Sequence, residues 1–437
     1  MPARLVRHLL AASAGVLITI LVIAFELAGR SEGRLPLSDL ARQLEALAYD
    51  LRLRTFAERE PAGRQPVVIV DLDERSLAEI GQWPWSRVRI AQLLDELAAA
   101  GAAVVAFDVV FAEPEPNPVD RVLAATATEL PPDVLALLRE RAPQLDGDRV
   151  LAERIAALET TAVALGVFLG QEARGIGARP QPVTRLPADV RTTLLGFDSW
   201  TGPPAALVEN TVTGHVITAP DDLDGVIRRA PLVARLRDEI VPALSLQIVR
   251  DFLLLEENDL ELARQGPALI PLAVRLGSSV RIPLDARGRV LVPYRGGART
   301  FPYLSAVDVL RDGLDAAERR SLQDAIVLVG TSSIGLADLR STPTDRVFPG
   351  VEIHATVVDA LLEAARRARD PQARPAFPRE PDLADELTVL GLLAAGLVLS
   401  LVLPLLGATA LVTVFAACAG TWLFLDATAW TVWGLDM

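Results

Sequence analysis

Three long apolar runs constrain this chain more than any other feature of its sequence. They span residues Leu9 to Phe25, Leu387 to Leu406 and Ala408 to Leu425. A helix needs roughly 20 mainly apolar residues to cross a bilayer, and each run approaches or reaches that length. The chain is also 51% hydrophobic, which is high for a protein without membrane segments. We therefore predict transmembrane helices at residues 9–28, 387–406 and 408–425.

The residues that precede the first run set its direction. Arg4, Arg7 and His8 lie there, and positive flanks stay in the cytoplasm, so residues 1–8 are predicted to be cytoplasmic. A cleaved signal peptide is the alternative. The run is longer than the usual apolar core of a signal peptide, however, and a poor cleavage site follows it. We therefore expect an uncleaved anchor that exports residues 30–372.

A proline-rich linker at residues 373–386 returns the chain to the membrane, where the second and third runs form a helical hairpin. Residues 426–437 carry Trp430 and Trp433 and are typical of an extracytoplasmic, interfacial stretch. Three crossings leave this tail outside. We therefore expect a further helix and a cytoplasmic output beyond it. The expected location is the inner membrane of a bacterial cell, crossed several times, with lipid as a partner and the main domain periplasmic or extracellular.

The composition excludes several classes of chemistry. All 43 basic residues are arginine, so a Walker-type phosphate loop, a Schiff-base lysine and a serine–lysine dyad are excluded. The single cysteine, Cys418, permits neither an intramolecular disulfide nor a cysteine-based zinc site. The formal charge is −13, and no basic stretch is interleaved with aromatic residues, which argues against nucleic acid as a partner.

The exported residues have the pattern of an α/β domain. Residues 67–70 form an apolar run that ends at Asp71, residues 87–100 an amphipathic helix, and residues 102–107 a second apolar run that ends at Asp108. Strand, helix and strand in this order favour a parallel unit. The pattern returns in a strand at residues 325–329, a turn-rich loop at 330–349 and a helix at 351–367.

The middle of the domain is more mixed. We predict strands, some of them antiparallel, at residues 212–219, 226–236 and 289–293, and a helix at 241–254. A further amphipathic helix is predicted at residues 37–56. The fold class is therefore α/β, with a mixed, partly parallel sheet and flanking helices in an extracytoplasmic domain, plus transmembrane helices.

Several motifs, taken in order, resemble those of the CHASE2 domain. They include Val67-Val-Ile-Val-Asp-Leu-Asp73, Gly81-Gln-Trp-Pro-Trp85, Asp222-Leu-Asp-Gly225, Ile326-Val-Leu-Val-Gly330 and Gly350-Val-Glu-Ile-His-Ala355. The resemblance covers nearly the whole exported region. It implies the input domain of a transmembrane receptor, usually followed by three membrane helices and a cytoplasmic adenylate cyclase or histidine kinase. It also implies a homodimer. Here only two apolar runs follow, and the sequence contains no cyclase or kinase motif.

Four aspartates follow predicted strands and are candidates for a ligand site. Asp71, Asp73, Asp108 and Asp338 lie where open α/β sheets bind their ligands, at the carboxyl ends of strands. Together they predict an acidic pocket for a cation or a cationic ligand. The alternative is structural, because aspartate at a strand exit commonly caps the following turn or helix. The sequence does not decide whether a metal binds, and it identifies no cofactor.

Five other residues each have a functional and a structural interpretation. Trp83, Trp85 and Arg87 surround a proline turn and could stack on a ligand, or could close the edge of the sheet and fix the entry to the helix. His354 lies one turn into a predicted helix beside Glu352 and is either a packed side chain or a supporting residue of the site. His215 is either a packed or helix-capping side chain or one ligand of a mixed metal site.

The leading functional hypothesis is a sensory module that responds to a small molecule or ion which the sequence does not identify, and that repacks its membrane helices. The alternative is an envelope scaffold without a small ligand. A metal-dependent hydrolase ranks last, because no nucleophile, base and orienting group can be named together.

Overall fold

The computed structural model describes residues 13, 15–24, 36–56, 66–126, 130–172, 174–182, 184–185, 194–218, 224–255, 260–264, 272–277, 280–336, 338–368, 375–378, 384–402, 413, 416–417, 420–421, 424 and 428–430. The chain divides into two compact units. One comprises residues 59–377, and the other comprises residues 1–58 together with 378–437. The helix predicted at residues 37–56 is present as α2 (Pro36–Phe56) and belongs to the second of these units.

The unit of residues 59–377 is built on a mixed sheet that has seven strands within the described residues. Most neighbouring strands are parallel. In spatial order its strands are β15 (Tyr303–Ser305), β1 (Val67–Asp71), β16 (Ile326–Gly330), β2 (Val104–Phe107) and β3 (Ala162–Gly170), with β7 (Val212–His215) parallel and β6 (Ser199–Thr201) antiparallel to β3. The predicted strands at both ends of the domain are confirmed. Strand β16 lies between β1 and β2, so these two are parallel but not adjacent.

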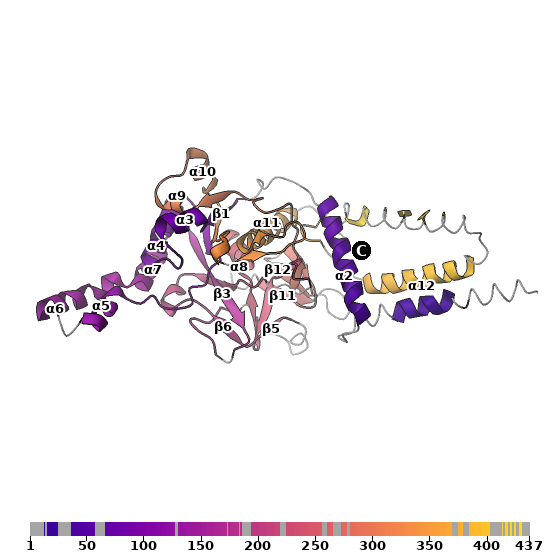
Figure 1. Ribbon diagram of the computed structural model, residues 1–437, viewed down its shortest axis with the longest axis horizontal. Helices are drawn as coiled ribbons and strands as arrows, with labels where there is room; N and C mark the ends of the chain where they lie inside the picture. The colour runs from indigo at the N-terminus through magenta and orange to yellow at the C-terminus, as the bar shows by residue number, and fades with distance from the viewer. Residues whose placement is uncertain are drawn as a thin grey trace, which may run out of the picture. The chain divides into compact units, whose positions relative to one another are not determined.

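Helices cover both faces of this sheet (Figure 1). They are α3 (Glu74–Ile80), α4 (Arg87–Ala99), α7 (Gly147–Ala156), α8 (Leu244–Phe252), α9 (Ala306–Leu310) and α11 (Gly350–Arg367), and shorter or peripheral helices are α5 (Pro118–Thr126), α6 (Pro132–Arg141) and α10 (Ala316–Ser321). Helices α8 and α11 pack together and against the strands, while α4 packs with α7 and α9. Helices α5, α6 and α7, at residues 118–156, were not predicted from the sequence.

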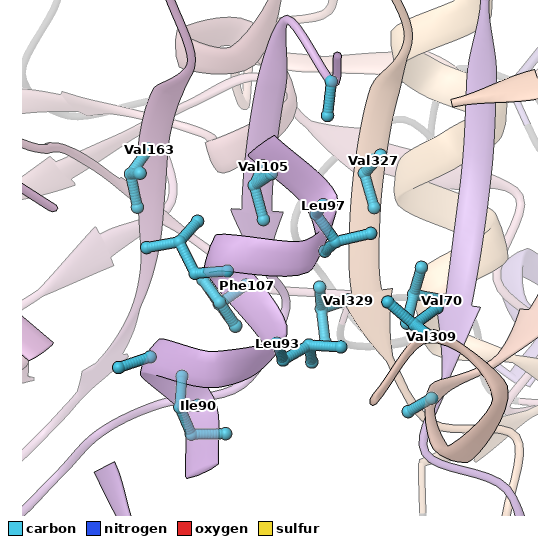
Figure 2. Packing of buried hydrophobic residues seen from close by; sticks show 14 of the residues in the cluster. Val70, Ile90, Leu93, Leu97, Val105, Phe107, Val163, Val309, Val327 and Val329 are labelled. Atoms are coloured by element: carbon cyan, nitrogen blue, oxygen red, sulfur yellow. The ribbon is translucent and has the colours of Figure 1, made fainter. Parts of the chain in front are cut away.

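The strands are buried on both faces, which explains why their sequences are continuous apolar runs. Val105, Val327 and Val329 belong to the hydrophobic cluster beneath α4, whose Leu93 and Leu97 point toward them (Figure 2). The intervening residue Leu328 is fully buried as well, and successive side chains of a strand point to opposite faces. Helix α11 covers the second face.

Smaller sheets complete this unit. One has the strand order β4 (Thr184–Arg185), β10 (Glu239–Pro242), β9 (Val233–Leu236) and β5 (Gly196–Phe197). A second has the order β11 (Leu260–Arg264), β12 (Leu272–Leu276) and β13 (Val280–Leu284). Two others have two strands each, β14 (Arg289–Leu291) with β8 (Arg229–Pro231), and β17 (Leu339–Arg340) with β18 (Phe348–Pro349). Most of these pairs are antiparallel. The prediction of a mixed α/β fold is therefore confirmed.

The unit formed by the two ends of the chain contains a described helix at residues 15–24, helix α2 and helix α12 (Ala384–Val402). Within the described residues, no helix combines the length and the apolar character that crossing a membrane requires. Residues 1–8, residues 373–374 and 379–383 of the predicted linker, and most of the predicted helix at 408–425 and tail at 426–437 lie outside the described residues.

Candidate functional site

The carboxyl edge of the large sheet gathers most of the polar residues that the sequence analysis selected. Strands β15, β1, β16 and β2 run in parallel, and the register pairs Asp71 with both Ser305 and Gly330. Asp108 follows directly after β2, and Asp338 lies in the loop that follows β16. The structure places these side chains in two separate groups, each with its own partners.

The first group surrounds Asp71, which is buried. Its carboxylate accepts hydrogen bonds from the backbone N–H (2.8 Å) and the hydroxyl (2.6 Å) of Ser332, and Arg299 lies 3.6 Å away. Burial raises the pKa of Asp71, and the two bonds from Ser332 oppose that rise. Arg299 is 61% exposed, and its guanidinium stacks 4.8 Å from the centre of the Tyr303 ring.

Asp73 has a different role from Asp71, although only one residue separates them. It is the N-cap of α3, because its carboxylate accepts a hydrogen bond from the backbone N–H of Ser76 (2.8 Å). The same oxygen accepts a bond from the hydroxyl of Ser305 (2.9 Å). These contacts fit the capping interpretation of an aspartate at a strand exit. They also tie the start of α3 to the end of β15.

Glu352 on α11 belongs to the first group, and the sequence analysis noted it only as a neighbour of His354. It is fully buried and accepts hydrogen bonds from the backbone N–H groups of Arg299 (2.8 Å) and Thr300 (2.7 Å) and from the hydroxyl of Tyr303 (2.9 Å). Burial raises the pKa of Glu352, and these three donors oppose the rise. A glutamate within an otherwise apolar stretch of a predicted core helix is the signal that could have identified it.

The second group, which we call the Asp108 group, comprises Asp108, Asp338, Arg340, His354 and His215. The side chains of His354 and Asp108 are only 7% and 6% exposed, and His354 Nε2 lies 3.6 Å from Asp108 Oδ1. Arg340 Nη2 lies 3.0 Å from Asp338 Oδ1. Sequence reasoning found Asp108, Asp338 and His354. It missed Arg340, which lies in a two-residue strand without a recognisable pattern.

Burial dominates the electrostatics of the Asp108 group. It raises the pKa of Asp108 to about 8, although nearby Arg340 acts in the opposite direction. Burial and the proximity of Asp108 raise the pKa of Asp338 to about 6. Burial also lowers the pKa of His354 to about 4, against the effect of Asp338. Strongly perturbed titratable residues gathered in one place are a common mark of a functional site.

His215 completes this group from the end of β7. It is fully buried, and neither of its ring nitrogens has a hydrogen-bond partner among the described residues. Burial, together with the proximity of His354, lowers the pKa of His215 to about 3. Arg340 Nε is also buried without a partner within the described part of the chain. Unpaired buried polar atoms are rare in native proteins and require an explanation.

The Trp83, Trp85 and Arg87 cluster belongs to the other side of the fold. Trp85 is buried in the hydrophobic cluster under α4, and its indole N–H donates to the carbonyl of Gly81 (2.7 Å). Arg87 is held by Asp148 (Nε to Oδ1, 3.0 Å) and stacks 4.4 Å from the centre of the Phe111 ring. Both contacts hold side chains of this turn within the fold. They fit the interpretation in which the turn fixes the start of α4.

The described residues contain no group of three or more histidine, cysteine, aspartate or glutamate side chains placed to hold a metal ion. Comparison with known proteins adds one match. The family model described as "CHASE2 domain" matches residues 17–398 of the chain. No curated protein and no solved structure matches it.

Proposed function

The chain belongs to the CHASE2 family, whose members are extracellular sensory domains, and on this premise we propose that it is the extracytoplasmic sensory part of a bacterial membrane receptor. A stimulus acts on the Asp108 group at the carboxyl edge of the large sheet. Helix α11 carries the resulting change toward the membrane helices. The output, an adenylate cyclase or a kinase, lies in the cytoplasm and outside this chain.

The observation that carries the proposal is the Asp108 group itself. Open α/β sheets bind ligands at the carboxyl ends of their strands, and this group lies there. It contains two carboxylates with raised pKa values, the nearly inaccessible Asp108 and the partly exposed Asp338, and a buried histidine, His215, whose ring nitrogens lack partners among the described residues. A purely structural edge would satisfy these groups within the fold.

Helix α11 supports the route to the membrane. Its first two turns carry Glu352 and His354, one from each polar group at the sheet edge. The helix is buried along most of its length and ends at Arg367. A short segment, residues 368–383, joins it to α12. A displacement of the first turn of α11 therefore has a direct covalent path to the second predicted membrane helix.

Apolar exposure supports the membrane part of the proposal. In the unit formed by the chain ends, the helix at residues 15–24 and α12 expose large apolar side chains, namely Leu17, Ile18, Ile20, Leu21, Leu390, Leu393, Leu397, Val398 and Leu401. Contiguous apolar surface of this kind is uncommon on proteins surrounded by water. Lipid would cover it.

The contact between these two helices has the character of membrane helix packing. A Cβ on Gly15 would lie 2.5 Å from Ser400 Oγ, and one on Gly396 would collide with Thr19. Small residues spaced four apart on both helices let the backbones approach closely, as in membrane helix pairs. The N-terminal helix and α12 are therefore suited to pass a displacement from one to the other.

The single cysteine, Cys418, allows the proposal to be tested in the full chain. The protein is labelled there with an environment-sensitive fluorophore, reconstituted in lipid nanodiscs and screened against amines, metal cations and small carboxylates, and across external pH. We expect at least one condition to change the emission of the probe in a saturable manner. Asp108→Ala should abolish the response, and the exposed control Asp133→Ala should retain it.

Two outcomes would contradict this function. A probe that responds to no condition would remove the sensory role and leave the scaffold hypothesis in its place. A labelled chain that leaves lipid vesicles on alkaline extraction would remove the membrane part, because stably inserted helices resist this treatment.

A further inference from the structure

We propose that the Asp108 group holds one proton in the state described here, and that loss of this proton as the external pH rises releases the first turn of α11. The stimulus is then external pH, with acid favouring the closed arrangement. This inference rests on the proposed sensory function and names the ligand of the same site.

The charge balance of the group is the first argument. It contains two carboxylates, Asp108 and Asp338, and one guanidinium, that of Arg340. Arg340 lies 3.0 Å from Asp338 and can neutralise only one negative charge. Asp108 is nearly inaccessible, and the ionisable group that lies within 4 Å of its carboxylate among those described is His354, at 3.6 Å. An unpaired buried carboxylate is costly, so the second negative charge must be cancelled by a proton.

The position of Asp338 is the second argument, because it connects this charge balance to α11. Gly350 is the first residue of the helix, and its N–H donates to the carbonyl of Asp338 (2.8 Å). A Cβ on Gly350 would collide with both carboxylate oxygens of Asp338, so the carboxylate lies against the helix N-terminus. One negative charge is favourable there. A second one, on neighbouring Asp108, is not balanced by any group described.

The ionisable groups around Asp108 come from several different elements of the fold. Strand β2 leads to Asp108, β7 ends at His215, β17 carries Arg340, the loop before it carries Asp338, and α11 carries His354. Glu352, also on α11, is engaged by its own three donors at the other group. Near neutral pH, the proton is therefore shared within the Asp108 group alone.

The directions of the pKa changes agree with this distribution. Burial raises the pKa of Asp108 to about 8 and that of Asp338 to about 6, and it lowers the pKa of His354 to about 4. At pH 7 the proton therefore resides on Asp108, while Asp338 is ionised and both histidines are neutral. The two carboxyls titrate as a coupled pair.

Linkage fixes the direction of the response. In an open arrangement that admits water, Asp108 would return toward its ordinary pKa and release its proton. The closed arrangement therefore binds more protons than the open one between about pH 6 and 8, and it gains stability as pH falls through that window. Below about pH 6 the gain stops, because in the open form His354 and His215 regain ordinary pKa values and take up protons as well.

The test is hydrogen–deuterium exchange of the full chain in lipid nanodiscs, followed in peptides that cover the first turns of α11. Exchange is measured from pH 6 to 9 and corrected for the intrinsic dependence on pH. We expect protection to fall at least tenfold toward high pH, with a midpoint near 8. Asp108→Asn, which copies the protonated acid, should hold high protection throughout. Asp133→Asn should behave like the unsubstituted chain.

A second variant tests the same proton assignment if Asp108→Asn fails to fold. Arg340→Gln removes the cation that lies beside the two carboxyls in the described part of the chain, so the midpoint should move to higher pH. Protection that does not depend on pH, or that depends on it equally in Asp108→Asn, would overturn the proton assignment. If the Cys418 probe still responded to a ligand at constant pH, the sensory function would stand without it.

Discussion

Glu352 should be a strong determinant of the structure around the sheet edge. Its Oε2 atom accepts hydrogen bonds from the Arg299 N–H and the Tyr303 hydroxyl, and its Oε1 atom accepts one from the Thr300 N–H. Arg299 has a positive φ of 66°, a conformation that is unfavourable for a residue with a side chain. The carboxylate therefore holds a strained turn in place as well as satisfying three donors.

The magnitudes follow from these contacts. In Glu352→Gln one oxygen becomes an amide NH2, so at least one of the three donors faces another donor, which costs about 1–3 kcal/mol. Burial raises the pKa of Glu352, so the ionised form carries a burial cost at neutral pH that glutamine relieves. We expect a net loss of about 1–2 kcal/mol. Glu352→Ala loses all three acceptors and leaves a cavity, for about 3–5 kcal/mol.

Thermal unfolding of the full chain in nanodiscs measures both variants. At about 2 °C per kcal/mol for a domain of this size, Glu352→Gln should lower the Tm by about 2–4 °C and Glu352→Ala by about 6–10 °C. Glu153→Gln is the matched control, because Glu153 forms an exposed pair with Arg149 and should change the Tm by less than about 1 °C. Equal Tm values for the alanine variant and the unsubstituted chain would refute the reasoning.

Two further predictions concern a close packing contact and a buried ion pair. Gly330→Ala should destabilise the fold by about 1–3 kcal/mol, because the new Cβ would lie 2.5 Å from the Cβ of Val351, and a Tm within 1 °C of the parent would contradict it. Arg87→Met should cost about 3–5 kcal/mol by leaving Asp148 buried without its partner, and thermal unfolding at pH 7 measures the loss. The second prediction fails if Arg87→Met is as stable as the parent chain.

The elements of the large sheet could be predicted because their sequences carry a strong local signal. Strands β1 and β16 are five-residue apolar runs bounded by aspartate or glycine, and continuous apolar runs of that length are typical of strands buried on both faces. Helix α11 follows a turn-rich loop and shows a clear apolar face. Such features depend on neighbouring residues alone.

The arrangement of the site could be predicted only in part, because it depends on which strands are neighbours. The sequence placed Asp71 and Asp108 at the same edge, which is correct. It could not show that β16 lies between their strands. Nor could it show that Ser332, in the loop after β16, donates hydrogen bonds to the Asp71 carboxylate. The four aspartates were predicted to converge in one pocket, but they lie in two separate groups. Arg340, 232 positions after Asp108 along the chain, has no local signal for its role.

Helix α11 brings these results together, because its buried face is not simply apolar. Glu352, His354, Asp359 and Glu363 are all nearly inaccessible. Asp359 is paired with Arg295 at 2.8 Å, and Glu363 with Arg366 and Arg367. Apolar residues of similar size would commonly make such a helix more stable, since buried ion pairs rarely recover the cost of removing charge from water.

On the proton assignment that we propose, these charges make the position of α11 depend on ionisation at the sheet edge. In its second half, the pair of Asp359 with Arg295 ties the helix to another part of the fold, whereas the pairs of Glu363 with Arg366 and Arg367 lie within the helix. In its first half, Glu352 is held by three donors, whereas His354 bonds to the backbone of Val216 and lies 3.6 Å from Asp108, in the group that lacks a balancing charge. In the proposed switch, a change at Asp108 acts on the start of α11 through His354 and Asp338, and the rest of the helix transmits it as a rigid element.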